Sequence, residues 1–412
     1  MGNFSIALSG LEADSVALNT IGNNLANLNT TAFKGQTTSF EDLFYQQIGQ
    51  SGSGDAIQLG AGTKVSGTST DFSEGTILPD ANPNPGDMAL AGNGFFVVEQ
   101  SGVQSLTRAG NFQLSSNGNL ITQDGQQVMG YAAVNGVVNQ NTNLTPITIP
   151  VGLNEGAQAT QNFSVTANLD SGATVGTSFS TPVQVFDSLG QSHQATVSYT
   201  KTATNTWSYA VTLPAGDATG PTANTTGTLT FDSSGNLVSP TGSVTGITFP
   251  GLTDGASDLS FNWNLNGSGS SPTITQLADA SSNSAAAVQD GFTSGVFQSF
   301  SADQNGVITA QFSNGRTATI AQVAVATVAN LQGLTASGNN NFTTTAASGQ
   351  ASIGVAGAGG RGLIDDGALE QSNVNISTEF SNLIVAQRAF EANSKTVTTF
   401  DTISQDVLAM IR

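Results

Sequence analysis

The segment IGNNLANLNTTAFKG, residues 21–35, decides how the N-terminal end of the chain folds. Its first apolar residues are three or four positions apart, which is the spacing of one face of an α-helix. Four asparagines crowd the same stretch, although Asn is a poor helix former. On a helical wheel Asn23 and Asn27 fall nearly opposite the apolar stripe. The segment therefore predicts a helix with two different faces, one apolar and one bearing uncharged amides.

The same apolar spacing extends towards the N-terminus. It predicts a helix that begins at Ser5 or Ser9 and ends at Thr30–Thr31, where β-branched residues disfavour further helix. The residues of the stripe are Phe4, Leu8, Leu11, Leu18, Ile21, Leu25 and Leu28.

The C-terminal end predicts a longer helix, over about residues 375–411. A seven-residue repeat runs through it, as in coiled coils, although polar residues interrupt the repeat. An ordinary amphipathic core helix is the alternative, but the matching helix at the other end favours a helix–helix pair. The residues expected to meet in that pair are Leu11, Leu18 and Leu25 with Leu383, Phe390 and Val397.

Between the two ends the pattern is that of β-strands and turns. Short alternating runs separated by Gly and Asn-Gly turns begin near residue 88, and SSNGNL (115–120) is a hairpin signal. Strands spaced in this way are typical of sandwiches or barrels. The expected fold is mainly β with terminal α-helices: nested, sandwich- or barrel-like β domains, and N- and C-terminal helices that pair in a coiled-coil-like domain.

Composition and pattern divide the chain into four parts, one nested inside another. The two ends form one helical domain, and a region with little periodicity connects it to the β domains. The expected parts are a terminal helical domain (1–35 and 363–412), a connecting region (36–87), an inner β domain (88–150 and 286–362) and an inserted outer β domain (151–285).

Charge and composition exclude several classes of partner. The formal net charge is −19, from 28 acidic and 9 basic residues, and the basic residues are scattered singly. We therefore expect no binding of nucleic acid, which requires a cationic surface. No apolar run approaches 18 residues, so we expect no membrane insertion. The chain has no Cys, which excludes disulfides and thiolate chemistry.

The residues that carry enzyme chemistry are sparse, and we expect no catalytic, cofactor or metal site. The one histidine, His193, has Asp187 as its nearest acidic candidate, and an exposed hairpin histidine is favoured over a catalytic base. Metal ligands do not cluster along the sequence. GAGGRG (357–362) has the spacing of a dinucleotide-binding loop, but no helix follows it directly. We therefore expect a protein that is not an enzyme.

Several motifs in a fixed order resemble the axial proteins of the bacterial flagellum, the family of rod, hook and junction proteins. The N-terminal motifs are SGL (9–11), IGNNLAN (21–27) and FKG (33–35). The β-region motifs are NGFFVV (93–98), LTRAGNFQL (106–114) and NGNL (117–120). The C-terminal motif is GALEQSNVNISTEFSNLIVAQRAFEANSKTV (367–397).

One position departs from the family pattern. The family commonly has Gly immediately before the Phe-Lys pair, where this chain has Ala32. A turn at Ala32 adopts a positive φ less easily than one at Gly, which puts the exact form of this turn in question.

Length and the inserted region favour one branch of that family. Rod proteins are shorter and lack a region like 151–285, and VFDSLGQSH (185–193) resembles a segment of hook proteins. The resemblance implies a structural subunit that polymerises into a curved, flexible tube and transmits motor torque from rod to filament. In that tube the terminal helices line the inside and the β domains stack outside. Asn23 and Asn27 are then expected to face neighbouring subunits.

The resemblance also implies partners and a location. The expected partners are further copies of the chain, the distal rod protein, the hook-cap protein, the hook–filament junction protein and the flagellar export apparatus. The expected location is extracellular, in the flagellum, after export without a cleaved signal peptide. The sequence leaves two alternatives open. One is another axial protein, of the distal rod or the junction, and the other is a secreted β-rich adhesin. A carbohydrate-active enzyme would need paired carboxylates, which the sequence does not locate.

Overall fold

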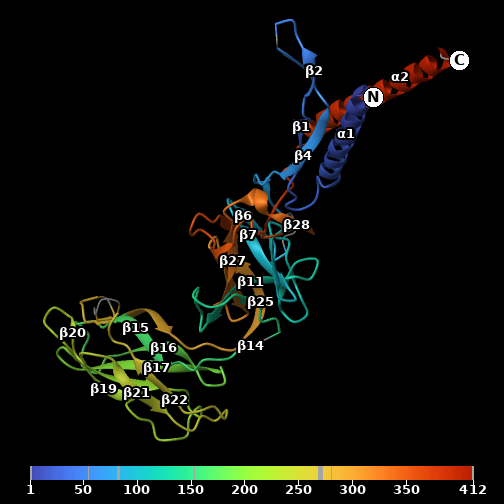
Figure 1. Ribbon diagram of the computed structural model, residues 1–412. Coiled ribbons are helices and arrows are strands. Elements are labelled where there is room, and N and C mark those ends of the chain that lie inside the picture. The colour runs from blue at the N-terminus through green and yellow to red at the C-terminus, as the bar shows by residue number, and fades with distance from the viewer. Residues whose placement is uncertain are drawn as a thin grey trace. The chain divides into compact units, whose positions relative to one another are not determined.

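The computed structural model describes residues 2–53, 55–80, 84–152, 154–267, 272–279 and 281–410. It is mainly β, with one helix near each end, so the expected fold class is confirmed (Figure 1). The chain divides into two compact units. Unit 1 comprises residues 1–151, 299–310 and 317–412, and unit 2 comprises residues 152–298 and 311–316.

The two helices of unit 1 lie side by side and run in opposite directions (Figure 1). They are α1 (Gly2–Ala26) and α2 (Ile376–Met410). The helix expected over 375–411 is therefore confirmed to within a residue at each end. Asn375 caps it, because its side-chain oxygen accepts the backbone N–H groups of Ser377 and Thr378 at 2.9 and 3.1 Å.

The N-terminal helix ends earlier than expected. It stops at Ala26 rather than at Thr30–Thr31, and it also begins earlier, at Gly2 rather than at Ser5 or Ser9, so both expected ends were wrong. Polar side chains just beyond the helix form hydrogen bonds at its last turn. Asn27 Nδ2 donates to the carbonyl oxygen of Asn23 at 2.9 Å, and Thr30 Oγ1 donates to Asn27 Oδ1 at 3.0 Å. Such local hydrogen bonds compete with continued helix.

The described residues between 36 and 80 include five strands, although the sequence showed little periodicity there. β1 (Gln36–Asp42) pairs antiparallel with β4 (Thr63–Thr70), and β2 (Gln46–Gln50) pairs with β3 (Ala56–Leu59). The β1–β4 ribbon lies against α1. Among the residues whose burial is described, neither ribbon has a buried side chain, and without a buried face a strand needs no alternation of apolar and polar residues.

The β framework of unit 1 is a single large sheet whose path includes β27, β11, β7, β8, β29 and β28 in that order. The FFVV run of β7 is buried on both of its faces, which explains an apolar stretch without alternation. The expected SSNGNL hairpin is present, as β9 pairs with β10. The core residues on one side of the sheet are Phe95, Val97, Leu106, Met129, Tyr131, Ala324, Ala326, Phe342 and Val355.

The remaining strands of the N-terminal part of unit 1 are β5 (Ile77–Pro79), β6 (Met88–Ala91), β7 (Phe95–Gln100), β8 (Val103–Thr107), β9 (Gln113–Leu114), β10 (Leu120–Ile121), β11 (Gln127–Val134), β12 (Val137–Val138) and β13 (Thr145–Pro146). Those of its C-terminal part are β27 (Thr317–Thr327), β28 (Thr335–Gly338), β29 (Asn341–Thr343), β30 (Ser352–Val355), β31 (Leu363–Asp366) and β32 (Ala368–Glu370), with a 3₁₀ turn at Leu331–Gly333.

The two strands before α2, β31 and β32, lie beside the two strands that lead into the large sheet, β6 and β5. β31 pairs antiparallel with β6, and β32 pairs antiparallel with β5. This pairing brings the end of β32 beside residues that follow α1, far away in the sequence.

Unit 2 is a β-sandwich. One sheet has the order β16-β17-β18-β19-β20, and the other contains β21, β22, β15, β23 and β24. A single apolar core, with Trp207, Tyr199 and Trp263 fully buried, receives side chains from both sheets. Its strands are β14 (Asn154–Glu155), β15 (Asn162–Asn168), β16 (Ser178–Phe186), β17 (Ser192–Ala203), β18 (Thr206–Thr212), β19 (Thr226–Phe231), β20 (Leu237–Ser239), β21 (Val244–Phe249), β22 (Leu259–Trp263), β23 (Ile274–Thr275) and β24 (Asn283–Gln289). Two more strands, β25 (Gly295–Ala302) and β26 (Val307–Phe312), have residues in both units.

Candidate functional site

Three sequence motifs from distant parts of the chain meet at Glu370, the last residue of β32. Lys34 of the FKG motif places its Nζ 2.6 Å from Glu370 Oε1. Arg108 of the LTRAG motif places its Nε 2.8 Å from Glu370 Oε2. The exposed fractions of the three side chains are 1%, 5% and 0%. We refer to Lys34, Arg108 and Glu370 as the Glu370 cluster.

Backbone groups satisfy the rest of the Glu370 cluster. Glu370 Oε1 also accepts the backbone N–H of Gly75 at 2.8 Å, and Lys34 Nζ donates to the carbonyl oxygen of Ser73 at 2.7 Å. The guanidinium of Arg108 donates to three further carbonyl oxygens, those of Leu90, Gly92 and Gly94. Buried charges of this kind are tolerated only when they are paired and hydrogen-bonded in this way.

The electrostatic balance of the Glu370 cluster is two cations against one anion. Burial lowers the pKa of Lys34, and the Glu370 carboxylate acts in the opposite direction without reversing the shift. Removing one partner of such a cluster leaves the others buried without compensation, which typically costs about 3–5 kcal/mol. The cluster therefore ties the segments that follow α1 and precede α2 to the β framework.

The turn at Ala32 belongs to the same junction. Ala32 has a φ of 55°, in the left-handed region, and its backbone N–H donates to the carbonyl oxygen of Glu370 at 2.8 Å. The positive φ that the turn requires is therefore kept, with the steric cost that a side chain brings. Asn373 adds a second tie, because its Oδ1 accepts the N–H of Gly35 at 2.8 Å and its Nδ2 donates to the carbonyl oxygen of Asp71 at 2.9 Å.

Asn24 holds α1 to β1, and sequence reasoning missed this role. Its side chain is 2% exposed. Its Nδ2 donates to the carbonyl oxygen of Gln36 at 2.7 Å, and its Oδ1 accepts the N–H of Gln36 at 2.9 Å. An amide is the side chain that can donate and accept in this manner, as a neighbouring strand does. The only sequence signal was its position at the border of the apolar stripe.

A single copy of the chain buries none of the eight residues expected at helix interfaces completely. Asn23 is exposed, Phe390 is 38% exposed, and the other six are half-buried: Leu11, Leu18, Leu25, Asn27, Leu383 and Val397. Small residues make the close approach between the helices, since Ala13 and Ala386 are buried and Gly10 faces Asn393. Asn393 Nδ2 donates to Asp14 Oδ2 at 2.9 Å.

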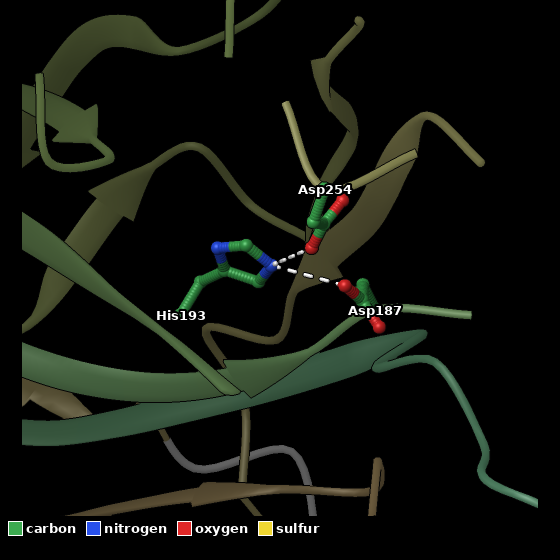
Figure 2. A group of neighbouring side chains, drawn as sticks. All are labelled: Asp187, His193 and Asp254. Carbon is green, nitrogen blue, oxygen red and sulfur yellow. Dashed lines mark hydrogen bonds and ion pairs between the residues drawn. The ribbon is translucent and has the colours of Figure 1, made fainter. Parts of the chain in front are cut away.

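His193 in unit 2 is buried, so the expectation of an exposed hairpin histidine was wrong. Its side chain is 7% exposed, and both ring nitrogens face carboxylates. Nδ1 lies 3.1 Å from Asp217 Oδ2, and Nε2 lies 3.1 Å from Asp187 Oδ2 and 3.4 Å from Asp254 Oδ2 (Figure 2). The fold brings Asp187, His193 and Asp254 together as potential metal ligands, although Asp254 is far from His193 in sequence.

The environment of His193 shifts two pKa values. Burial lowers the pKa of His193, but hydrogen bonds to Asp217 and Asp187 outweigh it and raise the pKa. Burial raises the pKa of Asp187, but hydrogen bonding with Asp254 and with His193, and the backbone N–H groups of Gln191 and Leu189, outweigh it and lower the pKa.

Four family models match successive parts of the chain. They describe a flagella basal body rod protein (residues 4–34), the flagellar hook protein FlgE/F/G D1 domain (89–168), the flagellar basal body protein FlaE D2 domain (167–292) and the flagellar basal body rod FlgEFG protein C-terminal region (365–410).

Curated relatives match almost the whole chain. The flagellar hook protein FlgE of Salmonella typhimurium strain LT2 is 36% identical over 97% of this chain and 98% of its own length. The chain belongs to the flagellar hook protein family. The hook proteins of Escherichia coli K12 and Borreliella burgdorferi are 35% and 32% identical, again over at least 97% of both chains. As a member of the hook protein family it is a structural subunit of the flagellar hook and not an enzyme.

A solved structure supports the hook-protein fold. The crystal structure of the Helicobacter pylori flagellar hook protein FlgE2 matches with a TM-score of 0.55 at 16% identity, over 71% of this chain and 100% of that one. At this identity the match concerns the fold alone. Among the residues described for this hook protein, no helix is long and apolar enough to cross a membrane.

Proposed function

We propose that this hook subunit polymerises through its terminal helices into a curved, flexible tube that transmits motor torque from the rod to the filament. The observation that carries the proposal is the open apolar surface of α2. Large apolar side chains of α2 remain exposed to solvent beside α1: Ile376, Phe380, Ile384, Val385, Phe390, Ile403, Val407, Leu408 and Met410. Monomeric proteins rarely leave such a surface uncovered.

The unequal lengths of the helices support contacts with further copies of the chain. α2 has 35 residues and α1 has 25, and α2 extends beyond the N-terminal end of α1 (Figure 1). Residues 401–410 are all exposed. Neighbouring subunits are the occupants that we propose for this surface, because a helical polymer offers each chain the same complementary surfaces.

Each predicted interface residue has a place in this proposal. Within one chain, we propose a seam of Leu11, Leu18 and Leu25 with Leu383, Phe390 and Val397, in which the 38% exposed Phe390 borders the open surface. The exposed amide of Asn23, together with Asn27, faces a neighbouring subunit, where an uncharged amide loses less hydration energy than a charge. The terminal domain (1–35 and 363–412) lines the tube, the inner β domain (88–150 and 286–362) surrounds it, and the outer β domain (151–285) forms the surface.

The Glu370 cluster gives this arrangement a mechanical element. Torque carried by the helices must reach the β framework through residues 27–35 and 371–375. The buried ion pairs and the turn at Ala32 resist movement at that junction, so bending is expected between subunits rather than at this point of the chain.

We propose four flagellar components as partners because the chain belongs to the hook protein family. They are the distal rod protein, the hook-cap protein, the hook–filament junction protein and the flagellar export apparatus. The proposed location is extracellular, with export that involves no cleaved signal peptide.

Electron microscopy of assemblies of the purified chain tests the proposal. A curved tube is expected, whereas a straight tube would indicate a rod-like axial protein and no polymer would favour a secreted β protein. Chains lacking residues 1–30 or 376–412 are the matched variants. They should fail to polymerise while their β framework still unfolds cooperatively, and tubes formed by a truncated chain would refute the role of the helices.

A further inference from the structure

A buried histidine and three aspartates converge in unit 2, and no role in the hook accounts for them. Asp187 follows β16, His193 lies at the start of β17, and Asp254 lies in the turn between β21 and β22. Figure 2 shows Nε2 of His193 directed at the carboxylates of both Asp187 and Asp254, at 3.1 and 3.4 Å. The fourth member, Asp217, approaches the other ring nitrogen from the loop between β18 and β19.

The hydrogens of the imidazole cannot satisfy these contacts. Nε2 carries at most one hydrogen, yet it faces one oxygen of Asp187 and one of Asp254. Nδ1 carries the other hydrogen towards Asp217 Oδ2 at 3.1 Å. When both carboxylates beside Nε2 are ionised, they have only this one hydrogen between them. Their oxygens lie within 4.8 Å of each other.

The charges are also out of balance. Three carboxylates surround one imidazole, so even a fully protonated ring leaves a formal charge of about −2. In the part of the chain that the structure describes, no Lys or Arg forms an ion pair with any of the three aspartates. Asp187 is fully buried, and there an excess of negative charge is costly.

A divalent cation resolves both problems. In a tetrahedral site with ligands at about 2.0–2.1 Å, neighbouring ligand atoms lie about 3.3 Å apart. The spacings of Nε2 to the two carboxylate oxygens, 3.1 and 3.4 Å, are close to that value. Imidazole nitrogen with carboxylate oxygen is a ligand set suited to Zn²⁺ and related ions. We propose that Asp187, His193 and Asp254 bind a divalent transition-metal cation, with Zn²⁺ as its representative.

The other contacts of the site have the form of supports for these ligands. Asp217 accepts the Nδ1 hydrogen and so directs the Nε2 lone pair at the metal, as a carboxylate commonly does for a metal-bound histidine. The second oxygen of Asp187 is held by the backbone N–H groups of Leu189 and Gln191 at 2.8 and 2.9 Å. On binding, Zn²⁺ takes the place of any proton on Nε2, and that proton passes to solvent.

The metal would fasten the two sheets of the sandwich to each other. Asp187 and His193 belong to the β16–β17 hairpin of one sheet, whereas Asp254 belongs to the β21–β22 turn of the other. The side chain of Asp254 is 28% exposed, so an ion can enter from solvent. Binding to the folded state alone raises the stability of unit 2 in proportion to the logarithm of the metal concentration.

Titration calorimetry of the full-length monomer with ZnCl₂ tests the proposal. We expect one Zn²⁺ per chain, and an unfolding temperature that rises with Zn²⁺ and returns to its starting value with EDTA. Asp254→Asn should weaken binding at least about 100-fold, and Asp217→Asn about 10- to 100-fold, as for groups that orient a ligand. Asp254 is the ligand to replace first, because it is partly exposed and Asn keeps an oxygen for the N–H of Ala256.

Asp258→Asn is the matched control. Asp258 lies in the same turn region, accepts the N–H of Gly251 at 2.9 Å and is outside the group of ligands. Its replacement by Asn keeps an oxygen for that bond and should leave Zn²⁺ affinity unchanged. Absence of saturable binding, or binding that Asp254→Asn does not weaken, would overturn the proposal. These measurements use the monomer, so their result does not depend on whether the chain forms tubes.

Discussion

Asn24 pairs through both atoms of its side-chain amide with the backbone of Gln36, twelve residues further along the chain. The donor and the acceptor of Gln36 are both used, so α1 is fastened to the first residue of β1. The asparagine-rich helix is thus explained in part by the chain's own fold. The amide of Asn24 serves the contact with β1, that of Asn27 bonds to Asn23 and Thr30, and Asn23 remains exposed.

Replacing Asn24 should destabilise the helix–ribbon contact. Asn24→Ala leaves the part-buried N–H and carbonyl groups of Gln36 without the Asn24 amide, and each such loss costs up to about 1–3 kcal/mol. The expected result is a lower urea midpoint for the monomer. Asn29→Ala, at an exposed position beyond the helix, is the control and should change the midpoint little. Equal effects of the two substitutions would show that the Gln36 contact carries no special weight.

Two ion pairs of the same length allow the effect of burial on stability to be measured. Lys34–Glu370 and Lys64–Glu41 are both ion pairs of 2.6 Å, but the second pair is about half exposed. Glu370→Gln should lower the free energy of unfolding by about 3–5 kcal/mol, because two buried cations lose their anion. Glu41→Gln should change the free energy of unfolding little, because solvent screens an exposed ion pair. Chemical denaturation measures both, and similar losses would contradict the assigned role of burial.

The amide face of α1 should matter for assembly and little for the monomer. We expect Asn23→Ala with Asn27→Ala to raise the concentration needed for polymerisation severalfold, because hydrogen bonds to neighbouring subunits are lost. The urea midpoint of the monomer should change far less than it does for Asn24→Ala. Sedimentation and electron microscopy measure assembly. Normal tubes at the normal concentration would show that these asparagines do not face a neighbour.

Crosslinks between outer domains should stiffen the tube. If bending requires the outer β domains of adjacent subunits to slide, a covalent bond between them will block it. The chain has no Cys, so introduced pairs within residues 151–285 form the only disulfides. Oxidised tubes should be straighter or stiffer than the same tubes after reduction. Unchanged curvature and bending stiffness would exclude sliding as the basis of flexibility.

Asp87 should make stability depend on pH in the acidic range. Burial raises its pKa, and the N–H of Asn84, which donates to Oδ2 at 2.8 Å, acts in the opposite direction without reversing the shift. The folded chain then holds this proton more tightly, so stability is greatest below the ordinary pKa, about 3.9, and falls as the pH rises through the raised pKa. Asp87→Asn keeps an acceptor for Asn84 and should be more stable than the parent at pH 7. Urea midpoints at several pH values should show the gap closing towards pH 4, and a constant gap would contradict this sign.

Local patterns predicted much of the fold, and long-range contacts escaped them. The seven-residue repeat located α2, and the SSNGNL turn located a hairpin, because both signals lie within a few residues. The β1–β4 ribbon was hidden, since strands exposed on both sides need no alternation. The Glu370 cluster was hidden for another reason: Lys34 and Glu370 are 336 residues apart, and Arg108 and Glu370 are 262 apart. His193 is similar, because Asp217 and Asp254 reach it only through the fold.

The separation of Lys34 from Glu370 also sets a condition on when the subunit becomes rigid. A chain that is only partly synthesised, or partly passed through a channel, holds one member of the pair without the other. Until both ends are present, the lysine and the arginine remain hydrated and the turn at Ala32 has no carbonyl oxygen to accept its N–H. We therefore expect residues 27–35 to become fixed to the β framework only after the chain is present through Glu370.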